Sequence, residues 1–190
     1  MFCSRNRRSL RSSAGEHATS EDFQRIFSED MAGLHLLAYL LTADHQLAEA
    51  VFVAGLEDTI DGNPVFREWA RPWSQRAIVK RAIKIMAPSP KESHRSSVHM
   101  DPQTGNEELD ALARSTTNLS TFQRFVFVLS VLEGYSIMEC AALLSCAPAD
   151  VIAAKVDALK LVAVHDNNQP EMPEPLINSW KSLFTPVRVS

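Results

Sequence analysis

The fold is decided by residues 136–162, which read SIMECAALLSCAPADVIAAKVDALKLV. Ser136 and Glu139 have the spacing of a capping box, in which the side chain of each residue accepts a hydrogen bond from the backbone N–H of the other. They predict a short helix over 137–144. Pro148 is a favoured first residue of a helix, so a second helix is expected from there to the end of the stretch. Two short helices separated by about three residues have the dimensions of a helix-turn-helix.

The composition favours a helical protein. The chain has 190 residues, of which 45% are hydrophobic and 22% are charged, as in ordinary globular proteins. It contains only six glycines, and Leu, Ala, Val and Ile dominate its apolar residues. These features disfavour a sandwich of sheets with many tight turns. We therefore predict an all-α fold of two small helical domains joined by a flexible linker, the second domain being a helix-turn-helix.

Apolar residues at steps of three and four predict three helices in the first half of the chain. The first is expected over about 20–42, with Ser20 as its cap and acidic residues in its first turn. The second is expected over about 44–61, where a run of turn residues ends it. The third is expected over about 65–87, with Pro72 breaking it into two pieces.

Interruptions of the apolar pattern divide the chain. Residues 88–106 are rich in Pro, Ser and His and lack an apolar period, as linkers do. The expected units are a disordered tail at 1–20, a helical domain at 21–87, a linker at 88–106, a helix-turn-helix domain at 107–164 and a C-terminal tail at 165–190. The last 25 residues hold four of the ten prolines and the cluster Trp180, Leu183 and Phe184, which we interpret as a docking element.

Charge is segregated along the first domain. The whole chain has a net charge of −4, so any binding of nucleic acid must be local. Residues 21–61 hold nine acidic residues and one basic residue, whereas 67–84 hold six basic residues and one acidic residue. Four of these basic residues share one helical face, and two tryptophans lie upstream of them. The basic side chains could bind phosphates, and the tryptophan rings could stack on unpaired nucleobases. The six residues are Trp69, Trp73, Arg76, Lys80, Arg81 and Lys84.

The same basic face has a structural interpretation. It could be a solvated surface that balances the acidic helices before it, with both tryptophans in the core. The sequence leaves these two alternatives open.

Other chemistry finds little support in the sequence. There is no Gly-rich phosphate loop, G-x-S-x-G or H-E-x-x-H motif, and the histidines lack acidic or cysteine partners at ligand spacing. We expect no enzyme activity, no catalytic residue, no metal and no cofactor. The cysteines Cys3, Cys140 and Cys146 form no C-x-x-C pair, which favours a reducing compartment, the cytoplasm. No apolar stretch approaches the roughly 20 residues of a membrane span, so we expect no membrane association.

Two neighbouring segments carry a family resemblance. Residues 119–129 read LSTFQRFVFVL, and residues 132–144 read LEGYSIMECAALL. They resemble the C-terminal domain of the sigma-70 family of bacterial RNA polymerase sigma factors, of the small extracytoplasmic-function type. The resemblance covers about 22–162, and it equates 21–87 with sigma region 2 and 107–164 with sigma region 4. It implies that the helix-turn-helix recognises the promoter −35 element through Ser136, Ala149, Asp150, Ile152, Ala153 and Lys155.

The N-terminal domain is similar to the same family in two places. Residues 47–52 resemble the helix that binds the polymerase clamp, which implies polymerase contacts at Ala48, Glu49, Phe52, Val53 and Leu56. Residues 66–69 and the basic helix after them resemble the part that melts and reads the −10 element. The implied function is that of a transcription initiation factor, which binds the RNA polymerase core and promoter DNA. An anti-sigma factor is a further partner that the resemblance allows.

Departures from the family pattern support an alternative. The clamp-binding helix of the family usually has an acid and a Gln where this chain has Ala50 and Val53. Residues 118–164 hold three bases and four acids, and Ile152, Ala153 and Ala154 stand where the family usually has bases. The alternative is a degenerate sigma-fold module that binds a protein and does not recognise promoters.

Overall fold

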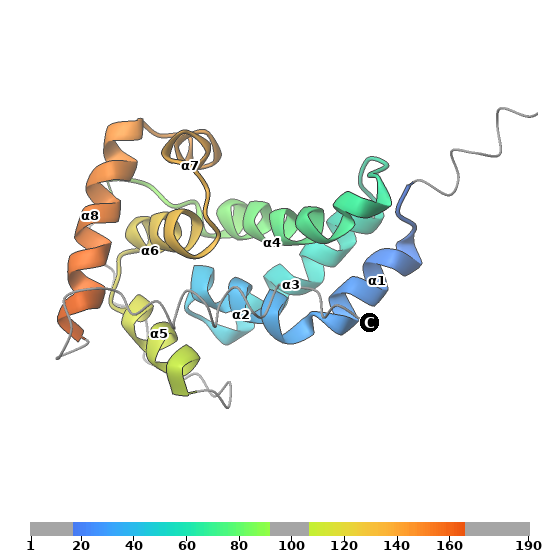
Figure 1. The fold of residues 1–190 in the computed structure, drawn as a ribbon, viewed down its shortest axis with the longest axis horizontal. Coiled ribbons are helices and arrows are strands. Elements are labelled where there is room, and N and C mark those ends of the chain that lie inside the picture. Colours follow the sequence, from blue (N-terminus) through green and yellow to red (C-terminus); the bar gives the residue numbers. More distant parts are fainter. Residues whose placement is uncertain (1–16, 92–106, 166–190) are drawn as a thin grey trace, which may run out of the picture.

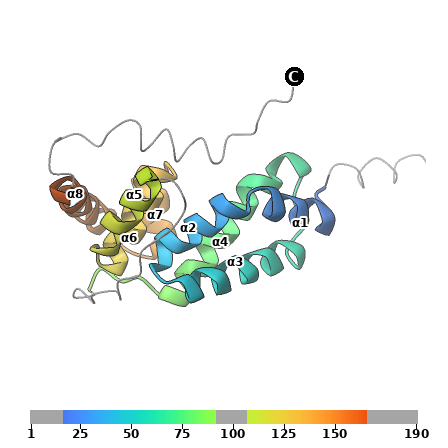
Figure 2. The same cartoon turned by 90° about the horizontal axis from the view of Figure 1, so that it is seen from below.

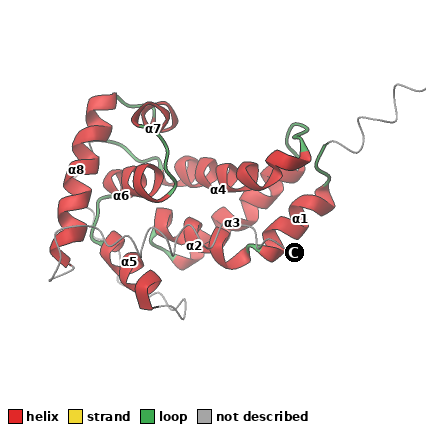
Figure 3. Cartoon of the chain, viewed as in Figure 1, coloured by secondary structure: helices red, strands yellow, loops and turns green. Residues whose placement is uncertain are grey.

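The computed structural model describes residues 17–91 and 107–165, and these are mostly helical (Figures 1 and 3). No β-strand occurs among them, and the isolated bridge between His17 and Phe66 is the one β-type contact that they contain. The predicted all-α fold is therefore confirmed. The molecule is elongated, with α1–α4 at one end and α5–α8 at the other (Figures 1 and 2).

The helices follow one another with short connections, except between α4 and α5, which are 20 residues apart. They are α1 (Ser20–Glu29), α2 (Met31–Thr42), α3 (His45–Ile60), the 3-10 turn η2 (Arg67–Trp69), α4 (Ala70–Met86), α5 (Glu107–Thr117), α6 (Thr121–Phe127), its π-helical continuation η3 (Val128–Leu132), α7 (Ile137–Leu144) and α8 (Pro148–His165). The bounds of α7 and the start of α8 agree with the sequence prediction. Ser145, in the left-handed conformation with φ 52°, ends α7.

Two helix predictions in the first half are wrong in their details. The helix expected over 20–42 is two helices, because the chain bends at Asp30 (φ −103°, ψ 21°). The bend lets α1 bury one face, while α2, which is apolar on nearly every side, runs through the core. Pro72 does not break a helix. It lies in the first turn of α4, where a missing N–H costs no helical hydrogen bond.

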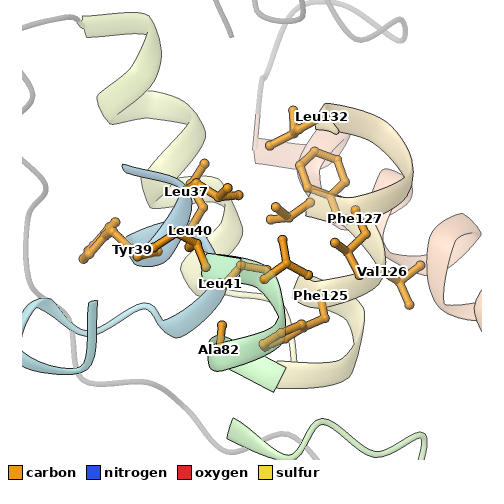
Figure 4. Close-up of a cluster of buried hydrophobic side chains, with 14 of the residues drawn as sticks. Leu37, Tyr39, Leu40, Leu41, Ala82, Phe125, Val126, Phe127 and Leu132 are labelled. Carbon is orange, nitrogen blue, oxygen red and sulfur yellow. The ribbon is translucent and has the colours of Figure 1, made fainter. Parts of the chain in front are cut away.

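A single hydrophobic cluster runs through both predicted domains. Leu37, Leu40 and Leu41 of α2 are 1% exposed or less, and the side chains of Phe125 and Phe127 of α6 are fully buried in the same cluster (Figure 4). Helix α2 packs on α3 and α4 on one side and on α5 and α6 on the other. The division into two domains stays a prediction, and the core that the two parts share fixes how they meet.

A buried cation lies at this junction. Arg124 of α6 is 1% exposed, and its Nε donates a hydrogen bond to the carbonyl of Leu41 at 3.2 Å. Its Nη2 donates to the carbonyl of Thr42 at 3.4 Å. The last carbonyls of a helix have no partner within it and carry the negative end of the helix dipole. Arg124 therefore caps α2 from another part of the chain.

Several expectations concern residues outside the described ranges. Residues 1–16 of the N-terminal tail, 92–106 of the linker and 166–190 of the C-terminal tail lie there. Residues 17–19, which also belong to the predicted N-terminal tail, are described. The N–H of Ala18 donates to the carbonyl of Val65 at 2.8 Å, and the rings of His17 and Phe66 stack with centroids 4.8 Å apart.

Within the described ranges, no single helix combines the length and the apolarity that crossing a membrane requires. Helices α7 and α8 satisfy both criteria only when taken together, and their axes differ by 108°.

Replacing Arg124 by alanine should lower the free energy of unfolding by about 2–3 kcal/mol, because two buried carbonyls are left without their charged donors. Urea unfolding measures this change. The control is Arg25→Ala, since Arg25 is 62% exposed and pairs with Asp22 at the surface, where such pairs contribute less than about 1 kcal/mol. Equal losses in the two variants would contradict a structural role for Arg124.

Candidate nucleic-acid interface

Ion pairs link η2 and α4 to the helices before them, and these pairs use half of the basic residues between 67 and 84. Acidic residues of α1, α3 and the bend between α1 and α2 supply the partners. The pairs are Arg67 with Asp22 (Nη2 to Oδ2, 3.0 Å), Arg71 with Asp30 and with Glu29 (3.6 Å), and Arg81 with Asp58 (Nε to Oδ2, 2.9 Å). At these three basic residues, the segregated charge of the sequence therefore forms ion pairs between helices. A role of Arg81 in DNA binding stays a prediction.

Asp22 links the start of α1 to the turn that carries Trp69. Its carboxylate accepts hydrogen bonds from the backbone N–H of Thr19 and from Arg67 Nε, at 3.0 and 3.1 Å. The hydrogen bond from the Thr19 backbone, and after it the guanidinium of Arg67, lower the pKa of this carboxyl. The ionised carboxylate positions η2, which directly precedes α4.

The other half of the basic residues faces solvent beside two tryptophans. Trp69 is 60% exposed, so it is not a core residue, and Trp73 is half-buried. The ammonium group of Lys80 lies 5.2 Å from the centroid of the Trp73 ring, within the range of a cation–π contact. Arg76 and Lys84 are exposed on the same helix. We call Trp69, Trp73, Arg76, Lys80 and Lys84 the α4 cluster.

Two hollows adjoin the α4 cluster, and both are lined by Trp73 and Arg76. The larger, of about 400 Å³, lies between α4 and the segment that joins η3 to α7. Its lining residues are Trp69, Pro72, Trp73, Gln75, Arg76, Glu133, Gly134, Tyr135 and Glu139. The smaller, of about 290 Å³, is lined by Asp58, Asp61, Gly62, Trp73, Arg76, Ala77 and Lys80. The larger hollow has the size of a small-ligand site and places aromatic rings beside both signs of charge.

The segment opposite α4 is held by its own backbone. The N–H of Tyr135 donates to the carbonyl of Leu129 at 2.9 Å, which closes the π-helical end of α6. Gly134 has φ 73°, in the left-handed region where glycine carries no penalty. The hydrogen bond and the turn at Gly134 fix the backbone conformation of the segment that carries Tyr135. Sequence reasoning did not place Tyr135 in this site, because about 60 residues separate it from the tryptophans.

Carboxylates oppose the cation in the larger hollow. Hydrogen bonds from the backbone and the hydroxyl of Ser136 lower the pKa of Glu139, and the charge of Arg76 adds to this effect. Glu139 is therefore ionised at neutral pH and lowers the positive potential near Arg76. Glu133 lines the same hollow. Burial raises the pKa of Tyr135, so its hydroxyl remains protonated and can donate a hydrogen bond.

The residues predicted to contact the −35 element lie at the start of α7 and in the first turns of α8, and they differ in exposure. Ser136 caps α7, and its hydroxyl accepts a hydrogen bond from the N–H of Glu139 at 3.2 Å. Asp150 Oδ2 accepts one from the N–H of Ala147 at 3.2 Å, and Lys155 Nζ lies 3.4 Å from the carbonyl of Ser130. Ala149, Ile152 and Ala153 are exposed. The outer side of α8 is therefore more apolar than basic.

The residues predicted to contact polymerase lie on α3 in two groups. Ala48 is fully buried, so its side chain supports the helix and is not available to a partner. Phe52 and Leu56 pack against the core, and the Phe52 ring meets that of Phe27 edge-on at 5.2 Å. Glu49 is exposed and Val53 is 49% exposed, so of the five predicted residues these two are available to a partner.

Cys140 lies on the buried side of α7. Burial raises the pKa of its thiol to about 11, and burial also raises the pKa of Cys146. At neutral pH both thiols are protonated, which is the inert form. Within the described ranges, no group of three or more His, Cys, Asp or Glu side chains is arranged to hold a metal ion.

Comparison of the chain with protein-family models, with curated proteins and with solved structures finds no match. The fold and the α4 cluster define a helical protein with an aromatic and basic surface.

Alkylation should distinguish the two described thiols. In a Cys3→Ser variant at pH 8, iodoacetamide should label Cys140 at least about tenfold more slowly than Cys146, since a pKa of about 11 leaves on the order of one thiolate in a thousand. Mass spectrometry of the peptides measures both rates. The difference should disappear in urea, and equal labelling of the native protein would contradict the burial of Cys140.

Proposed function

We propose that this protein is a sigma-like transcription initiation factor, which binds the RNA polymerase core and positions it on promoter DNA. The observation that carries the proposal is the α4 cluster, in which exposed Trp69 of η2 and half-buried Trp73 are followed along α4 by Arg76, Lys80 and Lys84. Aromatic rings stack on unpaired bases and cations neutralise the phosphates between them. Such a surface suits DNA whose strands have been separated, as in the −10 element.

The arrangement of α7 and α8 supports a second DNA contact. The two helices are joined by three residues, and their axes differ by 108°, within the range of helix-turn-helix units. The first turns of α8 are exposed at Ala149, Ile152 and Ala153, where such a unit meets the major groove. In the proposal, these turns dock on the −35 element while the α4 cluster binds the −10 element.

The polymerase contact is assigned to α3. Of the residues assigned to it, Glu49 and Val53 are exposed, and Phe52 and Leu56 pack against the core beneath them. The function proposed is binding in the cytoplasm, with no bond made or broken by this chain. An anti-sigma factor would be a further partner.

Charge reversal in the α4 cluster should abolish initiation. An Arg76→Glu/Lys80→Glu variant is expected to give no transcript above that of polymerase core alone, because two attractions to phosphate become repulsions. Transcription from a randomised promoter library, reconstituted with polymerase core from the source organism, measures the outcome. Lys91→Glu is the control for charge, since Lys91 is exposed and lies beyond α4. Unchanged transcript levels in the double variant would overturn the assignment of this face.

A salt titration tests DNA binding directly. Neutralising the two cations, as Arg76→Gln/Lys80→Gln, should reduce the slope of log affinity for single-stranded DNA against log salt by about 1.4, at roughly 0.7 for each phosphate that no longer meets a cation. Fluorescence anisotropy of a labelled oligonucleotide, with the chain bound to polymerase core, measures the slope. Lys91→Gln should leave the slope unchanged. An equal slope in the wild type and the double variant would contradict phosphate binding by these residues.

One observation favours the alternative function. The outer side of α8 exposes Ile152 and Val156 and carries Asp157, where a reader of base edges presents basic or amide side chains. This surface suits a protein partner, as in a sigma-fold interaction module without promoter recognition. Absence of DNA binding at low salt, both with and without polymerase, would favour this alternative.

A further inference from the structure

The outer side of α8 carries an apolar stripe that no other described helix covers (Figure 1). Ile152 is 52% exposed and Val156 is 45% exposed, and they lie one turn apart on the same face. Ala149 and Ala153 are exposed beside them, and Leu159 lies at the edge of the stripe, partly buried against the core. The opposite side of α8 packs on α6 and α7. Large apolar side chains side by side in water indicate a docking surface.

The sequence after α8 supplies a segment with a matching pattern. It lies outside the described residues and contains Leu176, Ile177, Trp180, Leu183 and Phe184. At 100° per residue these five positions fall within an arc of about 120°, which is the width of an apolar face that packs on one neighbour. Asn178, Ser179, Lys181 and Ser182 take the remaining positions. Residues 176–184 therefore have the periodicity of an amphipathic helix whose apolar side needs a cover.

The chain between the two is long enough to bring them together. Helix α8 ends at His165, and ten residues separate it from Leu176, among them Pro170, Pro173 and Pro175. Ten residues of proline-rich chain span up to about 31 Å. The path back along α8 from His165 to Ile152 is about 20 Å at 1.5 Å per residue. A nine-residue helix is about 13 Å long, close to the roughly 15 Å between Ala149 and Leu159.

We propose that residues 176–184 fold as a short helix that docks on Ala149, Ile152, Ala153, Val156 and Leu159 of the same chain. The segment 166–175 is the tether that reverses the chain direction. The short tether keeps the segment at a high effective concentration near α8, which favours it over a separate partner with the same apolar pattern. The docked segment covers the first turns of α8, so whatever binds these turns must displace it. The proposal does not depend on promoter recognition.

Trp180 reports on this docking in the full chain. The protein has three tryptophans, so Trp69→Phe/Trp73→Phe leaves Trp180 as the single fluorophore. Docking should shift its emission to the blue and reduce its acrylamide quenching at least about threefold relative to the chain in urea. Adding Ile152→Asp/Val156→Asp should reverse both effects, because charges on the stripe expel an apolar helix. The matched control is Val53→Asp/Ile85→Asp, since these residues are 49% and 41% exposed on other helices.

The outcomes distinguish docking of residues 176–184 on the stripe from binding of a second copy of the chain. Trp180 as accessible as in urea would overturn the proposal, and so would protection that persists in the Ile152→Asp/Val156→Asp variant. Protection that appears only at high protein concentration, together with dimers in sedimentation, would assign the stripe to a second copy and also overturn it.

Hydrogen exchange provides a measurement with every native tryptophan in place. In the otherwise unaltered chain, Leu183→Asp/Phe184→Asp should increase amide exchange in the first half of α8 and leave α3 unchanged. Equal exchange in the variant and the wild type would contradict docking even if the fluorescence variants failed to fold.

Discussion

The structure depends on the burial of one guanidinium group. Arg124 is removed from water at the junction of α2 and α6, and a buried cation is tolerated only when its donors are satisfied. The carbonyls of Leu41 and Thr42 accept two of its hydrogen bonds, and these are groups that α2 itself leaves without helical partners. The same hydrogen bonds therefore give partners to the buried guanidinium and to the terminal carbonyls of α2, and they join α6 to the end of α2. Helix α8 in turn packs on α6, and α7 packs on α8.

The candidate site follows from that placement. Helix α6 ends in a π-helical turn. The loop after it, with Glu133 and Tyr135, and the start of α7, with Glu139, lie opposite Trp69 of η2 and Trp73 of α4. Ion pairs from α1 and α3 neutralise Arg67, Arg71 and Arg81, and they leave Arg76, Lys80 and Lys84 exposed. The acidic residues of the hollows moderate the charge of this face. A surface of this kind binds through stacking and geometry as well as through charge.

Local rules account for the helices that the sequence predicted well. The capping box of Ser136 and Glu139, the left-handed Ser145 and the first-position Pro148 act within a few residues of one another, so α7 and α8 follow directly from the sequence. The same rules failed at Asp30, where helical periodicity continues across a bend, and at Pro72, whose effect depends on where the helix begins. They also placed both tryptophans together, but they could not decide between core and surface.

The sequence alone determined the all-α class, the bounds of α7 and the clustering of basic residues beside Trp69 and Trp73, because these depend on composition and on spacing within one or two turns. Tertiary structure decided which bases face solvent, that Trp69 is exposed and Ala48 is not, and that Tyr135 faces α4. The reason is physical: exposure and ion pairing depend on residues tens of positions away. Their arrangement is set by the shared core and by the buried charge of Arg124, and no local pattern encodes it.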